Sequence, residues 1–448
     1  MTKETLCVPC VHCGNPVGEW FPETLPDPDN SAINRSGHEF FASVQALNNS
    51  LPTLVAAFEE QDDTFSSGFS ILKDAIADRA FPAASVAVTH ADNLVALRAF
   101  GRFTYQEVVA PPFSRSLREG GDLDLCVTPA TLFDLASVTK AVATTTMAML
   151  LYERGLLELE APVAGVVPEF LANECGEDDP RRRDVTFHML LAHASGLPAY
   201  EKLFLKAHSR EDLLRAAFTT SLSTAPGTRA EYSDIGFIVL GTALERMAEE
   251  ALDSFCQREV FGPLRMSSTT FNPPKESRDK IPPTADERSE KEDGAGAPAR
   301  STLRQRIIQG EVQDENASIL GGVAGHAGLF STAEDLARFA NAMIHGGSPI
   351  LRPETVALFT RRESTPAGTS RTLGWDTPSA PSQSGKHFGS GSFGHLGYTG
   401  TSLWIDPERQ LSITLLTNRT WPDCGNQAIR QIRPRFHDAL VEHLIEQK

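Results

Sequence analysis

A serine and a lysine three residues apart stand at the head of a long apolar segment. The pair is Ser137 and Lys140, and residues 141–151 are apolar apart from three threonines. The segment is rich in helix formers and ends at Gly155, a suitable C-terminal cap. Residues three apart share one face of a helix, so the two side chains are expected to meet. A lysine buried there would lose its proton more readily and could activate the serine as a nucleophile.

The spacing alone is not specific, because the chain carries the same pattern at Ser70 and Lys73. That second pair lies in an amphipathic helix predicted around residues 69–76, where the lysine is expected to face water. Ser137 instead begins an apolar helix, whose N-terminus favours negative charge. The sequence therefore favours Ser137, while an N-cap serine with a surface lysine stays open from this segment alone.

Two further segments could complete a site around such a serine. Residues 225–236 offer Tyr232 and Asp234 in a turn before a predicted helix. Residues 394–401 open a C-terminal strand pair and contain His395 and Gly397. A strand of small residues with a basic side chain can face a nucleophile and donate a backbone N–H to its oxyanion.

Together these segments resemble the serine β-lactamase and penicillin-binding-protein superfamily, in its class C and esterase-like branch. The resemblance extends from about residue 65 to the C-terminus. Residues 137–140 resemble the SxxK motif, residues 232–234 resemble YxN with Asp234 in place of asparagine, and residues 395–397 resemble the HxG form of the KTG motif. The three motifs occur in the order that the superfamily shows.

The resemblance implies roles for the proton-transferring residues. Ser137 would be the acylated nucleophile. Lys140 and Tyr232 would form the proton-transfer pair, with Tyr232 acting as general base or as a relay held by Lys140. We expect the lysine ammonium to lower the pKa of the phenol.

The resemblance also implies which groups would contact the substrate. The backbone N–H groups of Ser137 and Tyr398 would bind the oxyanion. Asp234, His395 and Gly397 would line the substrate side. No metal and no cofactor are expected.

Two departures from the motifs bear on the substrate. Leu396 lacks the hydroxyl that β-lactamases and DD-peptidases place where a substrate carboxylate docks, although Thr399 or Thr401 could replace it. An ionised Asp234 cannot donate a hydrogen bond to an amide carbonyl. Both point away from an efficient β-lactamase and towards an esterase or peptidase.

The sequence thus predicts a serine hydrolase that cleaves an ester or amide bond through an acyl-enzyme. Its substrate would be a small ester, an amide or a muropeptide-like compound. A D-Ala-D-Ala carboxypeptidase, a penicillin-binding protein or a weak β-lactamase is the first alternative. A catalytically idle protein that binds a peptidoglycan fragment or a partner is the second.

Other motifs receive structural interpretations. His193 and His326 are expected to brace turns. The glycine-dense residues 321–328 lack a phosphate-loop pattern and predict a close backbone approach at a sheet edge. Cys7, Cys10 and Cys13 could hold zinc with His12, but no second pair with finger-like spacing follows, which favours an irregular tail.

The order of predicted elements indicates an α+β fold of the β-lactamase and transpeptidase type. Strands are expected at residues 84–89, 95–100, 401–405 and 411–417, with helices between them. N- and C-terminal segments would form one antiparallel sheet flanked by helices, with an inserted all-helical lobe at about residues 156–319. Residues 1–63 would be an irregular extension, and residues 64–448 the hydrolase domain.

Composition excludes some classes of partner. The chain has 448 residues, a net charge of −17 and seven scattered cysteines. An acidic chain is a poor nucleic-acid binder, and an odd cysteine count fits reduced thiols. No signal peptide and no bilayer-spanning apolar segment are visible, so a cytoplasmic location is the default expectation.

Overall fold

The computed structural model describes residues 50–105, 126–288 and 304–446. Its main sheet has six strands in the order β1-β3-β2-β11-β10-β9. Their bounds are β1 Val55–Ala56, β2 Ala83–His90, β3 Asn93–Gly101, β9 Phe393–Leu396, β10 Ser402–Asp406 and β11 Leu411–Thr417. Neighbours are antiparallel except β1, which runs parallel to β3. The predicted sheet of N- and C-terminal segments is confirmed.

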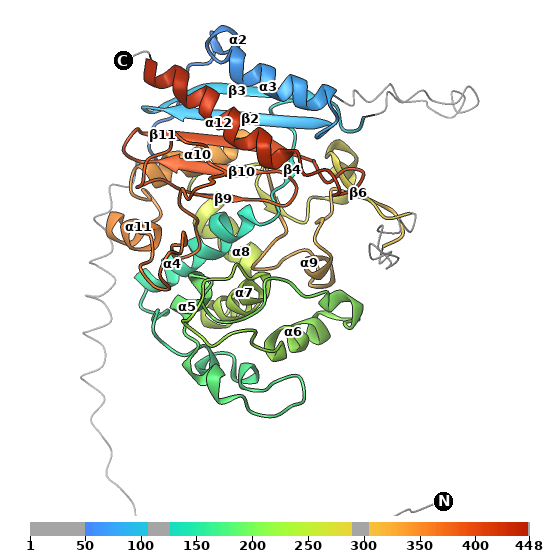
Figure 1. The fold of residues 1–448 in the computed structure, drawn as a ribbon, viewed down its shortest axis with the longest axis vertical. Coiled ribbons are helices and arrows are strands. Elements are labelled where there is room, and N and C mark those ends of the chain that lie inside the picture. The colour runs from blue at the N-terminus through green and yellow to red at the C-terminus, as the bar shows by residue number, and fades with distance from the viewer. Residues whose placement is uncertain (1–49, 106–125, 289–303, 447–448) are drawn as a thin grey trace, which may run out of the picture. The chain divides into compact units, whose positions relative to one another are not determined.

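Strand β2 shows why the sheet is covered on both faces. All but the last of its eight residues are buried. Val86 and Val88 pack with helices α3 (Ser66–Ala77) and α12 (Ile429–Glu446), which cross the same face in Figure 1. Ala83 and Ala87 point the other way, into the larger core. Helix α10 (Ala333–Ile344) packs on that second face.

A mainly helical lobe is inserted between the two halves of the sheet (Figure 1). Its α-helices, with the flanking ones, are α4 Thr146–Glu153, α5 Phe187–Leu191, α6 Arg210–Thr219, α7 Asp234–Ala248, α8 Leu252–Cys256, α9 Glu315–Ile319 and α11 Pro353–Thr360. Short strands accompany them: β4 Phe133–Asp134, β5 Thr270–Phe271, β6 Pro283–Asp286, β7 Ile307–Gln309 and β8 Leu329–Ser331. The prediction that the lobe at residues 156–319 is all-helical is therefore wrong in this detail, since strands β5, β6 and β7 lie within it.

The N-terminal boundary at residue 63 stays a prediction, but ordered elements precede it. Strand β1 and helix α2 (Gln61–Thr64) begin before residue 64, and Phe58 packs against the core. The cysteine cluster at residues 7–13 lies outside the described residues. In the described ranges the cysteines form no disulfide, as predicted, and no helix is both long and apolar enough to cross a bilayer.

Candidate active site

The candidate nucleophile sits on a strained turn. Ala136, directly before Ser137, has φ of +47°, in the left-handed region that costs a non-glycine residue about 1–3 kcal/mol. Asp134 stabilises this turn, because its carboxylate accepts the N–H groups of Ala136 at 2.8 Å and Gln313 at 2.7 Å. Burial raises the pKa of Asp134 to about 6, although both N–H donors oppose the rise. The turn holds Ser137 at the edge of a cavity.

Lys140 is fully buried behind Ser137, in a π-helical turn at Lys140–Thr145. Its ammonium donates to Ser137 Oγ at 3.0 Å, Asp234 Oδ1 at 2.6 Å and the His326 carbonyl oxygen at 2.9 Å. These bonds use all three donors of an ammonium group. Burial by itself lowers the pKa of Lys140, but attraction to Asp234 and Tyr232 outweighs burial and raises it. The prediction that this lysine readily loses its proton is therefore wrong.

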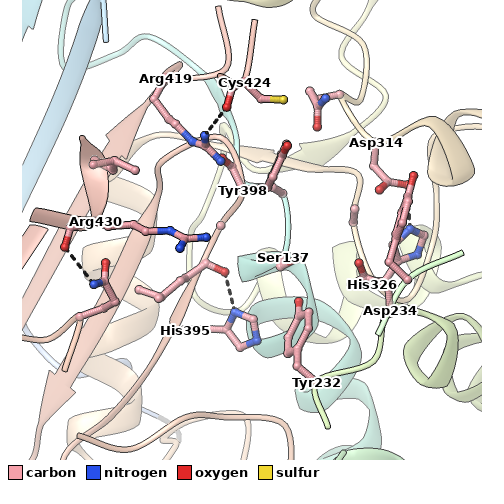
Figure 2. A pocket seen from close by; sticks show the side chains of 18 of the residues that line it. Ser137, Tyr232, Asp234, Asp314, His326, His395, Tyr398, Arg419, Cys424 and Arg430 are labelled. Atoms are coloured by element: carbon pink, nitrogen blue, oxygen red, sulfur yellow. Dashed lines mark hydrogen bonds and ion pairs between the residues drawn. The ribbon is translucent and has the colours of Figure 1, made fainter. Parts of the chain in front are cut away.

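Tyr232 lies beside the same pair. Lys140 Nζ stands 4.9 Å from the centre of its ring, and in Figure 2 its hydroxyl is directed towards Ser137. The hydroxyl oxygen is buried and has no hydrogen-bond partner within the described part of the chain. Burial raises the pKa of Tyr232 more than the Lys140 ammonium lowers it. The predicted lowering of this pKa is wrong, and the phenol is neutral and able to donate its proton.

Two histidines brace these residues, as predicted. His193 Nδ1 accepts the Ser233 N–H at 3.0 Å, and its ring packs 4.7 Å from the ring of Tyr232. Ser233 in turn caps α7, which begins at Asp234. His326 holds Lys140 through its carbonyl, and its Nε2 lies 2.8 Å from Asp314 Oδ1.

The glycine-dense segment before His326 makes the close approach that the sequence predicts. A Cβ atom on Gly325 would overlap the carbonyl oxygen of Phe237. The partner is helix α7, however, and not a sheet edge. The segment is thereby pressed against the helix that begins with Asp234.

The third motif lies on β9, opposite the serine. His395 Nδ1 lies 2.8 Å from the Leu396 carbonyl oxygen and donates to it. Burial, assisted by repulsion from Lys140, lowers the pKa of His395 to about 3, so the ring is neutral. His395 cannot supply the positive charge that the lysine of a KTG motif would bring.

The turn after β9 is fastened to the serine segment. Thr399 and Thr401 are buried, and their hydroxyls donate to the backbone carbonyls of Asp134 at 2.7 Å and Leu135 at 2.9 Å. Neither hydroxyl is available to a substrate. The suggestion that one of them replaces the hydroxyl missing at Leu396 is wrong.

Gly397 occupies the tightest point of this contact. A Cβ atom there would overlap the Leu135 carbonyl oxygen and Thr401 Oγ1. We expect Gly397→Ala to move β9 away from the serine turn and to lower kcat/KM for any ester or amide by more than about tenfold, because small displacements of catalytic groups are costly. Steady-state kinetics check this, with Gly391→Ala as the control at an open position, where such an atom meets only the end of the Glu408 side chain. Full activity of Gly397→Ala would contradict the proposed role of this strand.

A cavity of about 920 Å³ joins these elements (Figure 2). It brings together six of the seven predicted site residues: Ser137, Tyr232, Asp234, His395, Gly397 and Tyr398. Lys140 stands behind them. The second serine–lysine pair, which we call the decoy pair, is confirmed to lie on the surface, since Ser70 and Lys73 are both exposed on α3. The described residues contain no cluster of three or more metal-binding side chains.

Sequence reasoning missed other residues of the cavity. Tyr200 and Asp314 line it on the side of the helical lobe, and Arg371, Arg419 and Arg430 line it elsewhere. No motif marks these residues. Asp314 precedes the predicted glycine-dense segment, and its pairing with a histidine twelve residues later would have been the only local signal.

A serine on a strained turn, hydrogen-bonded to a buried lysine between a sheet edge and a helical lobe, is the arrangement expected of a serine hydrolase that acts through an acyl-enzyme. The chain belongs to the Beta-lactamase family, whose model matches residues 58–434. The family model and the relatives described next place the chain among hydrolases of the β-lactamase and penicillin-binding-protein superfamily.

Individual relatives carry several names. The chain is 31% identical over 367 residues to an N-acetylmuramyl-L-alanine amidase of Bacillus subtilis (strain 168), covering 76% of this chain and 77% of that protein. It is 28% identical over 372 residues to a putative D-alanyl-D-alanine carboxypeptidase of Salmonella agona (strain SL483), covering 79% and 82%. Its fold is similar to EstCE1, a hydrolase with promiscuous acyltransferase activity, with a TM-score of 0.64, 21% identity and coverage of 85% and 99%.

Proposed function

We propose that this protein cleaves an amide bond in peptidoglycan-derived peptides through an acyl-enzyme on Ser137. The observation that carries the proposal is the 3.0 Å contact between Lys140 Nζ and Ser137 Oγ at the wall of a cavity large enough for a peptide fragment. The likeness to the muramyl-alanine amidase supports an amide substrate of this class.

Lys140 is mainly protonated at rest, so in the proposed acylation its minor uncharged form accepts the serine proton as Ser137 Oγ attacks the substrate carbonyl. The backbone N–H groups of Ser137 and Tyr398 are proposed to bind the resulting oxyanion. When the C–N bond breaks, the neutral phenol of Tyr232 gives its proton to the leaving amine. Lys140 then returns a proton to the phenolate, which leaves both groups in their starting forms.

Deacylation repeats the sequence with water in place of the serine. Lys140 takes a proton from water as the water oxygen attacks the acyl carbonyl. The C–O bond to Ser137 breaks, and Oγ receives the proton back from Lys140. The products are a carboxylic acid and the free enzyme.

The alternatives are an esterase, a carboxypeptidase or weak β-lactamase, and an idle binding protein. A substrate with a free terminal carboxylate would meet Leu396 and a neutral His395 at the third motif, which disfavours docking of that carboxylate there. An idle protein would not need the intact set of serine, lysine and tyrosine that acyl transfer requires.

Covalent labelling tests the proposal. We expect a fluorophosphonate probe to modify Ser137, with the adduct located by mass spectrometry, and Ser137→Ala to lose both labelling and hydrolysis of muropeptides. Ser70→Ala is the matched control, because that serine heads the same motif on the surface. Labelling retained in Ser137→Ala would contradict the proposal. Turnover of nitrophenyl esters by the wild type without turnover of muropeptides would favour the esterase alternative.

Asp234→Asn tests the state of the lysine. Asp234 contributes the largest attraction that raises the pKa of Lys140, so its removal leaves burial as the main influence and lowers that pKa. The base form would then exist at lower pH, and we expect the acidic limb of the kcat/KM profile to move down by more than about one pH unit. If the acidic limb of the pH profile does not move and the maximal kcat/KM falls, the result would instead indicate that Asp234 accepts the serine proton.

A further inference from the structure

Two exposed tyrosine rings line the cavity that contains Ser137. Tyr200 is 38% exposed and Tyr398 is 48% exposed. Tyr200 comes from the helical lobe, between α5 and α6, whereas Tyr398 follows β9 at the edge of the sheet. Figure 2 shows Tyr398 between Arg419 and Asp314, with Ser137 below them. Each of the two parts that enclose the cavity therefore contributes one aromatic surface, which is typical of a binding site for a ring-shaped ligand.

The ring of Tyr398 is available from one face only. The guanidinium carbon of Arg419 lies 4.5 Å from the ring centre and covers the other face. Arg419 is fixed in turn, because it donates to the Tyr398 carbonyl at 2.7 Å and to the carbonyls of Cys424 and Asn426, both at 3.2 Å. The exposed face of Tyr398 is thus held in place before a ligand arrives, which reduces the entropy lost on binding.

The backbone around Tyr200 is held from both sides. The carbonyl before it accepts the N–H of Asp234 at 2.9 Å, and the carbonyl after it accepts the side-chain amide of Asn316 at 2.8 Å. Asn316 lies in α9 directly after Glu315, so the second bond brings Tyr200 and Glu315 to the same end of the cavity. Burial, together with the negative charges of Asp314 and Glu315, raises the pKa of Tyr200, so its ring is uncharged.

Glu315 is the carboxylate of this end that has no cationic partner. It lines the cavity and forms no ion pair with the described residues, and the one N–H that its carboxylate meets is its own. Burial and repulsion from Asp314 raise its pKa. Arg304, the cation that opposes this rise, is paired with Glu287 at 2.6 Å, and Asp314 is paired with His326 at 2.8 Å. Glu315 therefore keeps hydrogen-bond acceptors for a ligand.

We propose that Tyr200 and Tyr398 hold a neutral hexopyranose ring of the substrate, with Glu315 accepting hydrogen bonds from the sugar hydroxyls. The C–H groups on the faces of a pyranose suit the negatively polarised faces of tyrosine rings, and the hydroxyls at its edge are donors for a carboxylate. The proposed mechanism places the leaving amine at Tyr232, so the sugar belongs to the acyl half of the substrate. This inference rests on the proposed function for the reaction, while the subsite itself can be tested by binding.

Two other ring-shaped ligands fit the lining less well. A purely apolar ring would cover Glu315 without offering it a donor, and a buried carboxylate without a partner is costly. A cationic amino sugar would meet repulsion, because the described lining carries five lysine and arginine side chains against four carboxylates. One of these cations, Lys202, lies two residues after Tyr200.

Matched amides test the preference for a sugar. The nitroanilides of N-acetylmuramic acid and of 2-methoxypropanoic acid share the acyl carbonyl and the leaving group, and a methyl group replaces the sugar in the second. We expect the wild type to favour the muramyl compound by more than about tenfold in kcat/KM. Tyr200→Leu should reduce this ratio more than about threefold, whereas Tyr200→Phe, which keeps the ring, should stay within about twofold of the wild type. Tyr152→Leu is the matched control, because Tyr152 is 36% exposed and lies outside the cavity.

Binding separates this inference from the proposed function. Ser137→Ala is titrated with methyl N-acetylglucosaminide, methyl glucosaminide and cyclohexanol, and binding is followed by saturation-transfer NMR. We expect the neutral sugar to bind most tightly, and the added changes Tyr200→Leu and Glu315→Ala each to weaken it more than about threefold. Such binding supports the subsite even if Ser137 is never labelled in the wild type. Equal or tighter binding of cyclohexanol or of the amino sugar, or no binding of the neutral sugar, would overturn the inference while leaving Ser137 labelling untouched.

Discussion

Lys140→Met is expected to lower kcat/KM about 10⁴-fold, the upper end of what general acid–base groups contribute. The variant removes the group that contacts Ser137 Oγ at 3.0 Å and that would accept the serine proton. Methionine has a similar length and suits the buried, apolar surroundings of the site. Its effect on folding is moderated because Asp234, which loses its cation, is 16% exposed and can be hydrated. Steady-state kinetics with a muropeptide and a nitrophenyl ester measure the loss.

Lys73→Met is the control for this variant. It changes the lysine of the decoy motif, which is exposed on α3, and should leave kcat/KM within about twofold, as is usual for surface substitutions. Thermal unfolding of both variants separates a catalytic loss from a folding defect. A folded Lys140→Met variant with near-normal turnover would show that the lysine only positions the serine.

Tyr232→Phe is expected to lower amide hydrolysis about 10³-fold and to spare activated esters. The phenol is neutral because burial raises its pKa, so its proposed task is to protonate the departing amine. A nitrophenolate leaves without a proton, and its release should fall by less than about tenfold. The two substrates are compared in the same enzyme preparation, with burst kinetics to isolate acylation.

The alternative role of the tyrosine gives the opposite pattern. If Tyr232 were the base that activates Ser137, amide and nitrophenyl ester would lose equal factors, because both need the serine proton removed. Tyr152→Phe serves as the control, since Tyr152 is partly exposed on α4 and lies outside the cavity. Equal losses in Tyr232→Phe would therefore assign the serine proton to the phenol instead of Lys140.

Much of the site could be predicted because its residues lie at fixed offsets from strong local patterns. Ser137 and Lys140 head an apolar segment, Tyr232 lies just before helix α7, and His395 lies on strand β9. The same patterning gave the sheet, since β2, β3, β10 and β11 are short apolar runs bounded by turns. The distinction between Ser137 and Ser70 also came from patterning, and burial bears it out.

The charge states could not be predicted, because they depend on partners that are distant in sequence. Lys140 and Asp234 are 94 residues apart, and their contact decides that the lysine keeps its proton. The hydroxyls of Thr399 and Thr401 are likewise occupied by backbone carbonyls of residues 134 and 135, which are more than 260 positions away in the sequence. Pairwise contacts of this kind leave no mark on local composition, whereas helix and strand periodicity does.

The strand order has a consequence for how the enzyme is made. Strand β11 lies between β2 and β10, and Arg433 on α12 fastens the turn that faces the serine. The middle of the sheet is thus completed by residues that are translated long after Ser137. A nascent chain that already carries Ser137, Lys140 and Tyr232 still lacks the opposite wall of the cavity. The cavity wall opposite the nucleophile can therefore form only after residue 433 has been translated.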